Sequence, residues 1–320
     1  MMSVLDQLAA TLADLVDEDP RRVLLGEDVR DGGMLGLSRA TMAREHLHTR
    51  VAAMPLTPAS TWTHAAGLAL GGMRPIILSP SADALLEGFA GLLEMSSTHW
   101  RSGDQRPVPV LTLAPVGPGF GLGTGHASSP ETLLASVPGL RVVVVGRAEH
   151  AAAYLRAAAS FSAGEEPTVL LLPRTVLLQD TDTGQHELKH TFGHASPLTR
   201  GDTVTVFAWG PTVELALAAA AASECSVSVI DVSSLCPLDE TTLVSEANRT
   251  GKVVITHSGP HAFGMGAEIA ARLAQHSIMH LDAPVLRIAG EPGPYAPGDE
   301  SRALPTLPAI TEAIRQVASY

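Results

Sequence analysis

The strongest constraint on the fold is the alternation of short, unbroken runs of Val, Ile and Leu with longer Ala-rich stretches of helical periodicity. The apolar runs of the first half lie at 23–25, 75–78, 110–114, 142–145 and 169–172, and the helical patterns lie near 61–71, 82–100 and 148–160. A strand that is apolar at every position is buried on both faces, which is typical of a parallel sheet covered by helices. The sequence therefore predicts an α/β fold with largely parallel sheets.

The alternation lapses once, between Gln179 and Pro197, where the residues are polar and show no clear periodicity. Such a stretch is typical of a linker, and a chain of 320 residues is longer than one hydrophobic core usually serves. We expect a first domain over 1–180, a linker over 181–197 and a smaller α/β domain of about four strands over 198–320. Its expected strands lie at 203–208, 227–232, 252–257 and 285–289, with helices at 212–222, 239–249, 263–275 and 306–318.

The charge and the cysteine content narrow the class of protein. Lys and Arg number 21 against 33 Asp and Glu, so the net charge is −12, and an acidic surface repels nucleic acid. No apolar run approaches the ~18 residues of a membrane-spanning helix, and the N-terminal helical pattern after Ser3 carries acids where a signal peptide carries bases. The two cysteines, Cys225 and Cys236, are too few for a disulfide framework. We expect a cytoplasmic protein with neither a nucleic acid nor a membrane partner.

A glycine occupies every second position from Gly117 to Gly125, directly after the strand that ends at Ala114. The dinucleotide fingerprint and the phosphate-loop pattern are both absent from this segment. Two interpretations remain equally open, namely a flexible loop that lets His126 approach a ligand and a turn with a structural role only.

Other residues suggest chemistry more weakly. Glu27 and Asp28 follow a buried strand, at the edge where ligands of open α/β sheets bind, although a loop carboxylate without a ligand fits equally well. The thirteen histidines show no metal-ligand spacing, and the Gly-x-Ser-x-Gly signature of hydrolases is missing, so neither a metal site nor a serine hydrolase is expected. Met54, Trp62 and Met73 favour core packing over cofactor stacking.

Nine segments, in order along the chain, share a pattern with a known family. They are Leu25-Gly-Glu-Asp-Val29, Met54-Pro-Leu56, Gly67-Leu-Ala-Leu-Gly-Gly-Met-Arg-Pro75, Arg101-Ser-Gly103, Gly125-His-Ala-Ser-Ser-Pro-Glu131, Pro138-Gly-Leu-Arg-Val-Val143, Asp231-Val-Ser-Ser-Leu-Cys-Pro-Leu-Asp239, Gly264-Met-Gly-Ala-Glu-Ile-Ala-Ala-Arg272 and Leu281-Asp-Ala-Pro-Val285. Together they resemble the β subunit of the thiamine-diphosphate-dependent component of pyruvate and branched-chain 2-oxo acid dehydrogenases. The resemblance implies a transketolase-like fold, with a pyrimidine-binding domain followed by a transketolase-type C-terminal domain.

The resemblance also implies a cofactor and partners. In the family, two α and two β chains share thiamine diphosphate: the α subunit holds the diphosphate through Mg²⁺, and the β subunit surrounds the aminopyrimidine ring. The diphosphate motif, Gly-Asp-Gly followed by Asn, is absent here, as the family implies for a β chain. The implied activity is an oxidoreductase step in which a 2-oxo acid is decarboxylated and the acyl group passes to a lipoyl acyltransferase or another acyl carrier.

Six positions correspond to the family's cofactor site, and no metal ligand is among them. Glu27 matches an acid near the pyrimidine, and His126 matches the histidine that faces the reacting carbon. Pro58, which follows Leu56 and Thr57, stands where the family has the Glu that shares a proton with the ring N1′, and proline carries no acid. The family's Phe-Ala-Asp-Phe stretch reads Ser-Ala-Asp-Ala over 81–84, directly after Pro80, so Ala84 has lost the aromatic ring. The resemblance thus makes Glu27 and His126 catalytic, and it places Glu27, Leu56, Pro58, Pro80, Ala84 and His126 around the cofactor.

These departures leave two functions open. One is an active complex with an α partner. The other is a divergent or non-catalytic β-like subunit, which is either a structural partner of an α chain or part of a carboligase or acyl-carrier transfer in specialised metabolism. The overall resemblance favours the first function, and Pro58 and Ala84 favour the second.

Overall fold

The fold is that of a computed structural model, which describes residues 2–103, 105–160, 166–181, 188, 192–291 and 293–320. The chain forms two compact units. The first unit comprises 1–116, 133–143 and 148–188, and the second unit comprises 117–132, 144–147 and 189–320. Two short segments from within the range 1–180 therefore belong to the second unit. Most of the predicted linker, 181–197, lies outside the described residues.

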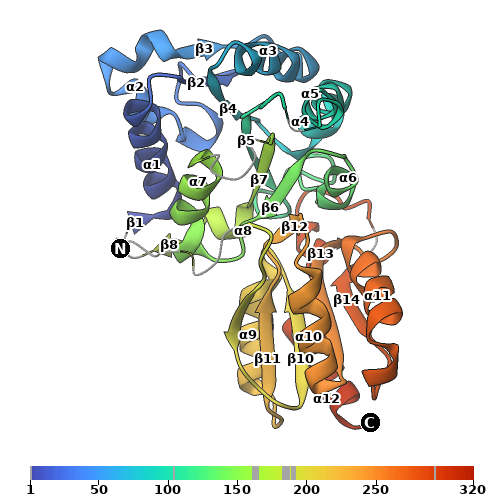
Figure 1. Cartoon of the computed structure of the whole chain (residues 1–320). Helices are drawn as coiled ribbons and strands as arrows, with labels where there is room; N and C mark the ends of the chain where they lie inside the picture. Colours follow the sequence, from blue (N-terminus) through green and yellow to red (C-terminus); the bar gives the residue numbers. More distant parts are fainter. Residues whose placement is uncertain (1, 104, 161–165, 182–187, 189–191, 292) are drawn as a thin grey trace. The chain divides into compact units, whose positions relative to one another are not determined.

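The first unit is built on a sheet with the strand order β6-β7-β5-β4-β2-β3 (Figure 1). The pairs from β7 to β3 are parallel, and β5, β6 and β7 are buried along their whole length. The strands are β2 (Arg22–Gly26), β3 (Val51–Ala53), β4 (Arg74–Leu78), β5 (Leu111–Val116), β6 (Arg141–Val144) and β7 (Thr168–Pro173), and a short β1 (Met2–Ser3) pairs with β8 (Asp180–Thr181).

Helices cover this sheet, and Figure 1 shows α1 beside α7 and α3 beside α5. Helix α1 begins as predicted, because the Ser3 hydroxyl accepts a hydrogen bond from the Asp6 N–H and caps its first turn. The helices are α1 (Val4–Glu18), α2 (Arg39–Met42), α3 (Pro58–Leu70), α4 (Ala82–Glu87), α5 (Phe89–Arg101), α6 (Glu131–Ala135), α7 (Ala151–Ser160) and α8 (Arg174–Leu177). The first two residues of α6 belong to the second unit.

The helix predicted over 82–100 is two helices, α4 and α5, which are separated at Gly88. A Cβ atom at this position would lie 2.3 Å from the Trp62 ring and 2.8 Å from the Pro58 Cβ. Only glycine therefore lets α3 approach so closely. The break between α4 and α5 results from their packing against α3, and the apolar periodicity of 82–100 contains no information about that contact.

The second unit contains a five-stranded sheet with the order β14-β13-β10-β11-β9. The four predicted strands are confirmed and run parallel, whereas β9 pairs antiparallel at the edge. The sequence did not reveal β9, because its alternating half-exposed residues lie in the polar stretch. The elements are β9 (Ser196–Thr199), β10 (Val204–Ala208), β11 (Val227–Asp231), β12 (Ser234–Cys236), β13 (Val253–Pro260), β14 (Leu286–Gly290), α9 (Thr212–Ala222), α10 (Glu240–Thr250), α11 (Met265–His276) and α12 (Leu307–Ala318).

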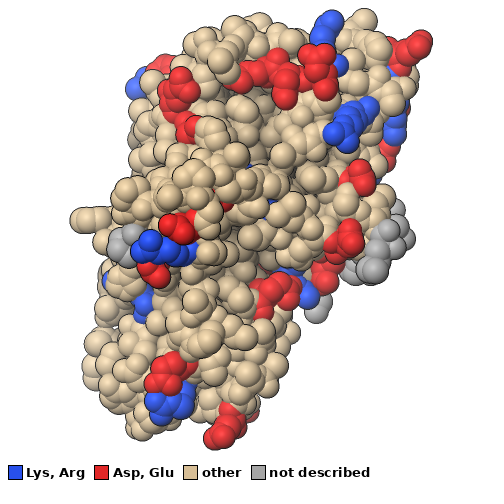
Figure 2. Space-filling view, turned by 180° about the vertical axis from the view of Figure 1, so that it is seen from behind, with Lys and Arg blue, Asp and Glu red and all other residues tan. Residues whose placement is uncertain are grey.

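The core of the second unit lies where α9 and α12 pack against each other and against the sheet, and it includes the fully buried Val206, Val229, Val254 and Ile314. The predicted α/β class is thus confirmed in both units. Cys225 and Cys236 form no disulfide and are half-buried. Among the described helices, none has both the length and the apolar content needed to span a bilayer. On the face shown in Figure 2, acidic groups are scattered over the surface and most Lys and Arg residues lie beside them.

Candidate active site

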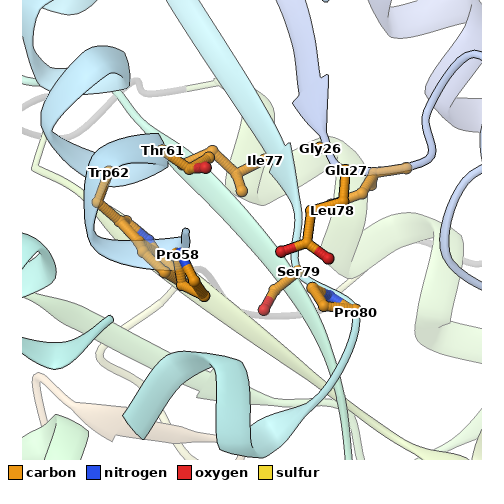
Figure 3. Close-up of a pocket in the computed structure, with 9 residues that line it drawn as sticks. All are labelled: Gly26, Glu27, Pro58, Thr61, Trp62, Ile77, Leu78, Ser79 and Pro80. Carbon is orange, nitrogen blue, oxygen red and sulfur yellow. The ribbon is translucent and has the colours of Figure 1, made fainter. Parts of the chain in front are cut away.

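A pocket in the first unit lies where β2 and β4 end. Gly26 at the end of β2 pairs with Leu78 at the end of β4, and because the two strands are parallel their carboxyl ends meet at one edge of the sheet. Helix α3 supplies the opposite wall (Figure 3). The lining residues are Gly26, Glu27, Pro58, Thr61, Trp62, Ile77, Leu78, Ser79 and Pro80. The structure thus brings together three of the six predicted residues, Glu27, Pro58 and Pro80.

Glu27 is the acid of this pocket. Its side chain is half-buried, and its carboxylate points toward Ser79 and Pro80, across the pocket from Pro58 and Trp62 (Figure 3). Burial raises the pKa of the Glu27 carboxyl, and the negative charges of Asp28 and Glu87 raise it further. Glu27 therefore keeps its proton to a higher pH than an ordinary glutamate.

The wall opposite Glu27 is formed by Pro58, Thr61 and Trp62 of α3. Pro58 is the first residue of α3, a position that proline favours because its missing N–H is not needed there. Trp62 lies one turn later with only 1% of its surface exposed, and its indole Nε1 donates to the Thr112 Oγ1 at 3.2 Å. The core role predicted for Trp62 is confirmed, although one edge of its ring lines the pocket. Pro58 thus contributes to the pocket a buried ring with no proton to exchange.

The size of the pocket limits what this chain can hold. The cavity has a volume of about 10 Å³, which is roughly the space of one water molecule. A pyrimidine ring is larger than this cavity, so the cavity does not enclose one. The lining residues would fit one side of such a ring, because the Glu27 carboxyl group could hydrogen-bond to a ring nitrogen and Pro58 and Pro80 could make apolar contacts.

The other predicted residues lie elsewhere. Leu56 is 82% exposed in the loop before α3, and Ala84 is buried in α4; neither lines the pocket. His126 belongs to the second unit, where it is exposed at the end of the glycine loop. Sequence reasoning missed Thr61 and Ser79, which line the pocket next to predicted positions.

The glycine loop is anchored by a residue that sequence reasoning did not select. The backbone N–H groups of Gly119, Gly121 and Gly123 all donate to the Glu300 carboxylate. The flexible-loop interpretation did not anticipate these bonds. The alternating glycines were the only feature near the loop that could have indicated a bound anion, because Glu300 lies 177 residues beyond Gly123.

A buried aromatic pair occupies the second unit. The His257 ring stacks on Trp209 with centroids 4.7 Å apart and an interplanar angle of 5°. Burial lowers the pKa of His257 to about 4, which keeps the ring neutral. Its Nε2 atom has no hydrogen-bond partner among the described residues, and it would lie 2.6 Å from a Cβ at Gly266, at the start of α11. His257 is thus packed against backbone, and no group of three possible metal ligands occurs in the part of the chain that the structure describes.

Comparison with known families gives two matches that span most of the chain. Residues 1–179 match the pyrimidine binding domain of transketolase, and residues 193–310 match the transketolase C-terminal domain. Among solved structures, a split gene transketolase described as an inactive beta4 tetramer superposes with a TM-score of 0.76 at 21% identity, over 99% of this chain and 98% of that one. The transketolase of Leishmania mexicana gives a TM-score of 0.68 at 16% identity, and this chain spans only 45% of its length. These two structures establish the fold alone.

Curated relatives align over nearly their full lengths. The pyruvate dehydrogenase E1 component subunit beta of Leifsonia xyli subsp. xyli is 32% identical, over 98% of this chain and 94% of the relative. The 2-oxoisovalerate dehydrogenase subunit beta of Bacillus subtilis is 29% identical, over 100% of this chain and 99% of the relative. A pyruvate dehydrogenase E1 component subunit beta of Staphylococcus epidermidis is 30% identical over 90% of this chain and 89% of its own length.

Proposed function

Because the chain belongs to the family of the pyruvate and 2-oxoisovalerate dehydrogenase beta subunits, with their transketolase-type domains, we propose that it is the β subunit of a thiamine-diphosphate-dependent enzyme that decarboxylates a 2-oxo acid. We also propose that it acts only with an α partner, which holds the diphosphate and Mg²⁺. The acyl group then passes to a lipoyl acyltransferase or another acyl carrier. Two cysteines without a disulfide are compatible with a reducing cytoplasm, where we expect this chain to act.

The observation that supports this proposal best is the pocket at the ends of β2 and β4. It combines one acid of raised pKa with flat apolar contacts, and it is too small to enclose a ring by itself. A site divided between two chains accounts for this geometry, because the second chain would supply the missing wall.

The roles of this chain's residues follow from their chemistry. Thiamine diphosphate, when bound, supplies the electron sink that decarboxylation requires. Glu27 holds a proton at the nitrogen edge of the ring, the role that Pro58 has no group to perform. His126 offers an imidazole N–H to an oxygen that becomes negative during the reaction, or transfers a proton to it. The Pro58 and Pro80 rings exclude water from the edge that Glu27 contacts.

A second candidate function is a β-like subunit that assembles with an α chain without ordinary catalysis. Pro58 favours it, because this position offers no carboxylate to the ring. Ala84 favours it as well, because no aromatic ring stands at this position and its side chain is buried in α4.

The test measures hydrogen exchange at C2 of the bound cofactor, by NMR after acid quench, in the complex with an α-type chain that carries the Gly-Asp-Gly and Asn motif. We expect exchange and CO₂ release from pyruvate or a branched 2-oxo acid. Glu27→Gln should slow the exchange by about 10²-fold or more, the scale for loss of a positioned acid or base. Asp31→Asn is the matched control, because it removes an exposed carboxylate near Glu27 that does not line the pocket.

Each outcome separates the candidates. Fast exchange that survives Glu27→Gln would assign the proton to a group of the α chain and refute the role of Glu27. Assembly without exchange, and without turnover of any 2-oxo acid, would establish the non-catalytic subunit.

A further inference from the structure

The glycine loop of the second unit closes around a carboxylate. The N–H groups of Gly119 and Gly121 donate to the Glu300 Oε2 at 3.0 Å each, and the Gly123 N–H donates to the Oε1 at 2.6 Å. Gly121 and Gly123 have φ angles of 66° and 85°, which L-residues rarely adopt. The alternation of glycines thus turns successive N–H groups toward one point, an arrangement that binds anions.

The anion bound by these N–H groups is the carboxylate of Glu300, a residue of the same chain. Glu300 begins the 3₁₀ helix η5 (Glu300–Ala303) and is only 4% exposed. Burial raises the pKa of the Glu300 carboxyl, whereas the hydrogen bonds from the N–H groups of Gly119, Gly123 and Gly121 lower it. Together these bonds outweigh the effect of burial, so the pKa lies below its usual value. Glu300 is therefore ionised at neutral pH, and its charge is balanced by backbone dipoles.

A second contact fixes the loop close to His126. The Thr124 hydroxyl donates to the Tyr295 carbonyl at 3.0 Å and accepts the Tyr295 N–H at 2.5 Å. The next turn is closed by a bond from the Ala127 N–H to the Gly123 carbonyl at 3.0 Å. Ala127 is buried whereas His126 is exposed. The backbone on both sides of His126 is thus held by hydrogen bonds, and His126 itself is exposed.

We propose that Glu300 is a positioning residue: its carboxylate, bonded to Gly119, Gly121 and Gly123, orders the glycine loop and thereby sets the place of the His126 imidazole. The inference rests on the proposed function for the role of His126 in the reaction, but not for the ordering of the loop. A loop with five glycines has many accessible conformations, and an acid or oxyanion donor acts only when it is held within hydrogen-bond reach of the reacting group.

The first arm of the test needs no activity. Hydrogen–deuterium exchange of the peptide 117–126 is compared in the wild type and in Glu300→Gln. The glutamine keeps one oxygen acceptor, but its NH₂ group cannot accept the backbone N–H hydrogen bonds that the second carboxylate oxygen accepts. We expect exchange at Gly119, Gly121 and Gly123 to become at least about tenfold faster, with little change in the midpoint of unfolding. Asp299→Asn is the matched control, because it removes the neighbouring exposed carboxylate and should leave this exchange unchanged. Equal protection in Glu300→Gln and the wild type would overturn the proposal.

Thr124→Val provides a second variant in case Glu300→Gln does not fold. It removes the hydroxyl contacts with Tyr295 at an exposed position. It should accelerate exchange around residue 124 by a smaller factor than Glu300→Gln, and unchanged exchange there would contradict the anchoring of the loop by the segment 295–300.

The second arm follows His126 itself. In histidine-labelled protein, the His126 ring signal should be a single resonance in the wild type and should shift or broaden in Glu300→Gln. In the complex with the α partner, Glu300→Gln should lower kcat and leave KM for the 2-oxo acid nearly unchanged. The double variant Glu300→Gln/His126→Ala should have a kcat only slightly below that of His126→Ala alone. Fully additive losses of kcat in the double variant would overturn the proposal. A wild-type complex without turnover would overturn the proposed function instead, and the exchange and ring-signal measurements would still decide whether Glu300 positions His126.

Discussion

Replacement of Glu131 by Gln should make the second unit more resistant to unfolding at high pH and leave it nearly unchanged at low pH. Glu131 begins α6 and is only 4% exposed. Burial raises the pKa of its carboxyl from 4.5 to about 7, although its own backbone N–H and the Trp209 indole lower it in part. The contact with Trp209 is weak, because the indole Nε1 does not meet hydrogen-bond geometry with any described residue.

The size of the effect follows from this pKa. The folded chain keeps the proton on Glu131 up to about pH 7, whereas the unfolded chain releases it near 4.5. The folded state binds more protons between these values, so the free energy of unfolding falls as the pH rises through this window. At about 1.4 kcal/mol for each pH unit, the penalty is about 3 kcal/mol at pH 8.5 and less than about 1 kcal/mol at pH 5. Gln carries no charge and avoids it.

Urea unfolding of the wild type, Glu131→Gln and Glu224→Gln between pH 5 and pH 8.5 measures this difference. The stability advantage of Glu131→Gln over the wild type should grow by about 2 kcal/mol across the range, with an unchanged dependence on urea concentration. Glu224 is exposed in the same unit, so its variant should follow the wild type. An advantage that does not change with pH would refute the assignment of a buried, proton-retaining carboxyl.

Gly88→Ala should lower the free energy of unfolding by roughly 1–3 kcal/mol, because its Cβ would lie 2.3 Å from the Trp62 ring. Gly67→Ala should raise the free energy of unfolding slightly, because a Cβ there would have no atom within 4 Å. The midpoints of urea unfolding measure both changes. His257→Phe should gain about 2 kcal/mol of stability relative to the wild type as the pH falls from 7 to 5. Between pH 6.5 and about 4, His257 is neutral in the folded chain but protonated in the unfolded chain, so acid destabilises the wild type. Thermal unfolding at pH 7 and pH 5 measures this difference. Calorimetry should show binding of thiamine diphosphate only when the α partner is present, and tight binding to the isolated chain would contradict a divided site. Cofactor C2 exchange should be slower than in relatives that keep the acid, and Pro58→Glu should accelerate it.

The sequence by itself determined most of the local elements and the edge of the sheet where the pocket lies. Unbroken apolar runs encode strands buried on both faces, and the hydroxyl of Ser3 encodes the start of α1, because these signals depend on neighbours within a few residues. Glu27 was selected because it follows a strand, and parallel strands bring their carboxyl ends to a common edge. The family resemblance added Pro58 and Pro80, which line the same pocket.

Only the tertiary structure decided which distant residues meet. The break at Gly88 exists because the Trp62 ring occupies the space of a side chain, and the exposure of Leu56 contrasts with the burial of Ala84 although both were assigned to the same cofactor. The partner of the glycine loop could not be found from its pattern, because any carboxylate of suitable reach satisfies three converging N–H groups. Glu300 is that partner because the folding of the second unit brings its carboxylate within 3.0 Å of Gly119, 181 residues earlier in the chain.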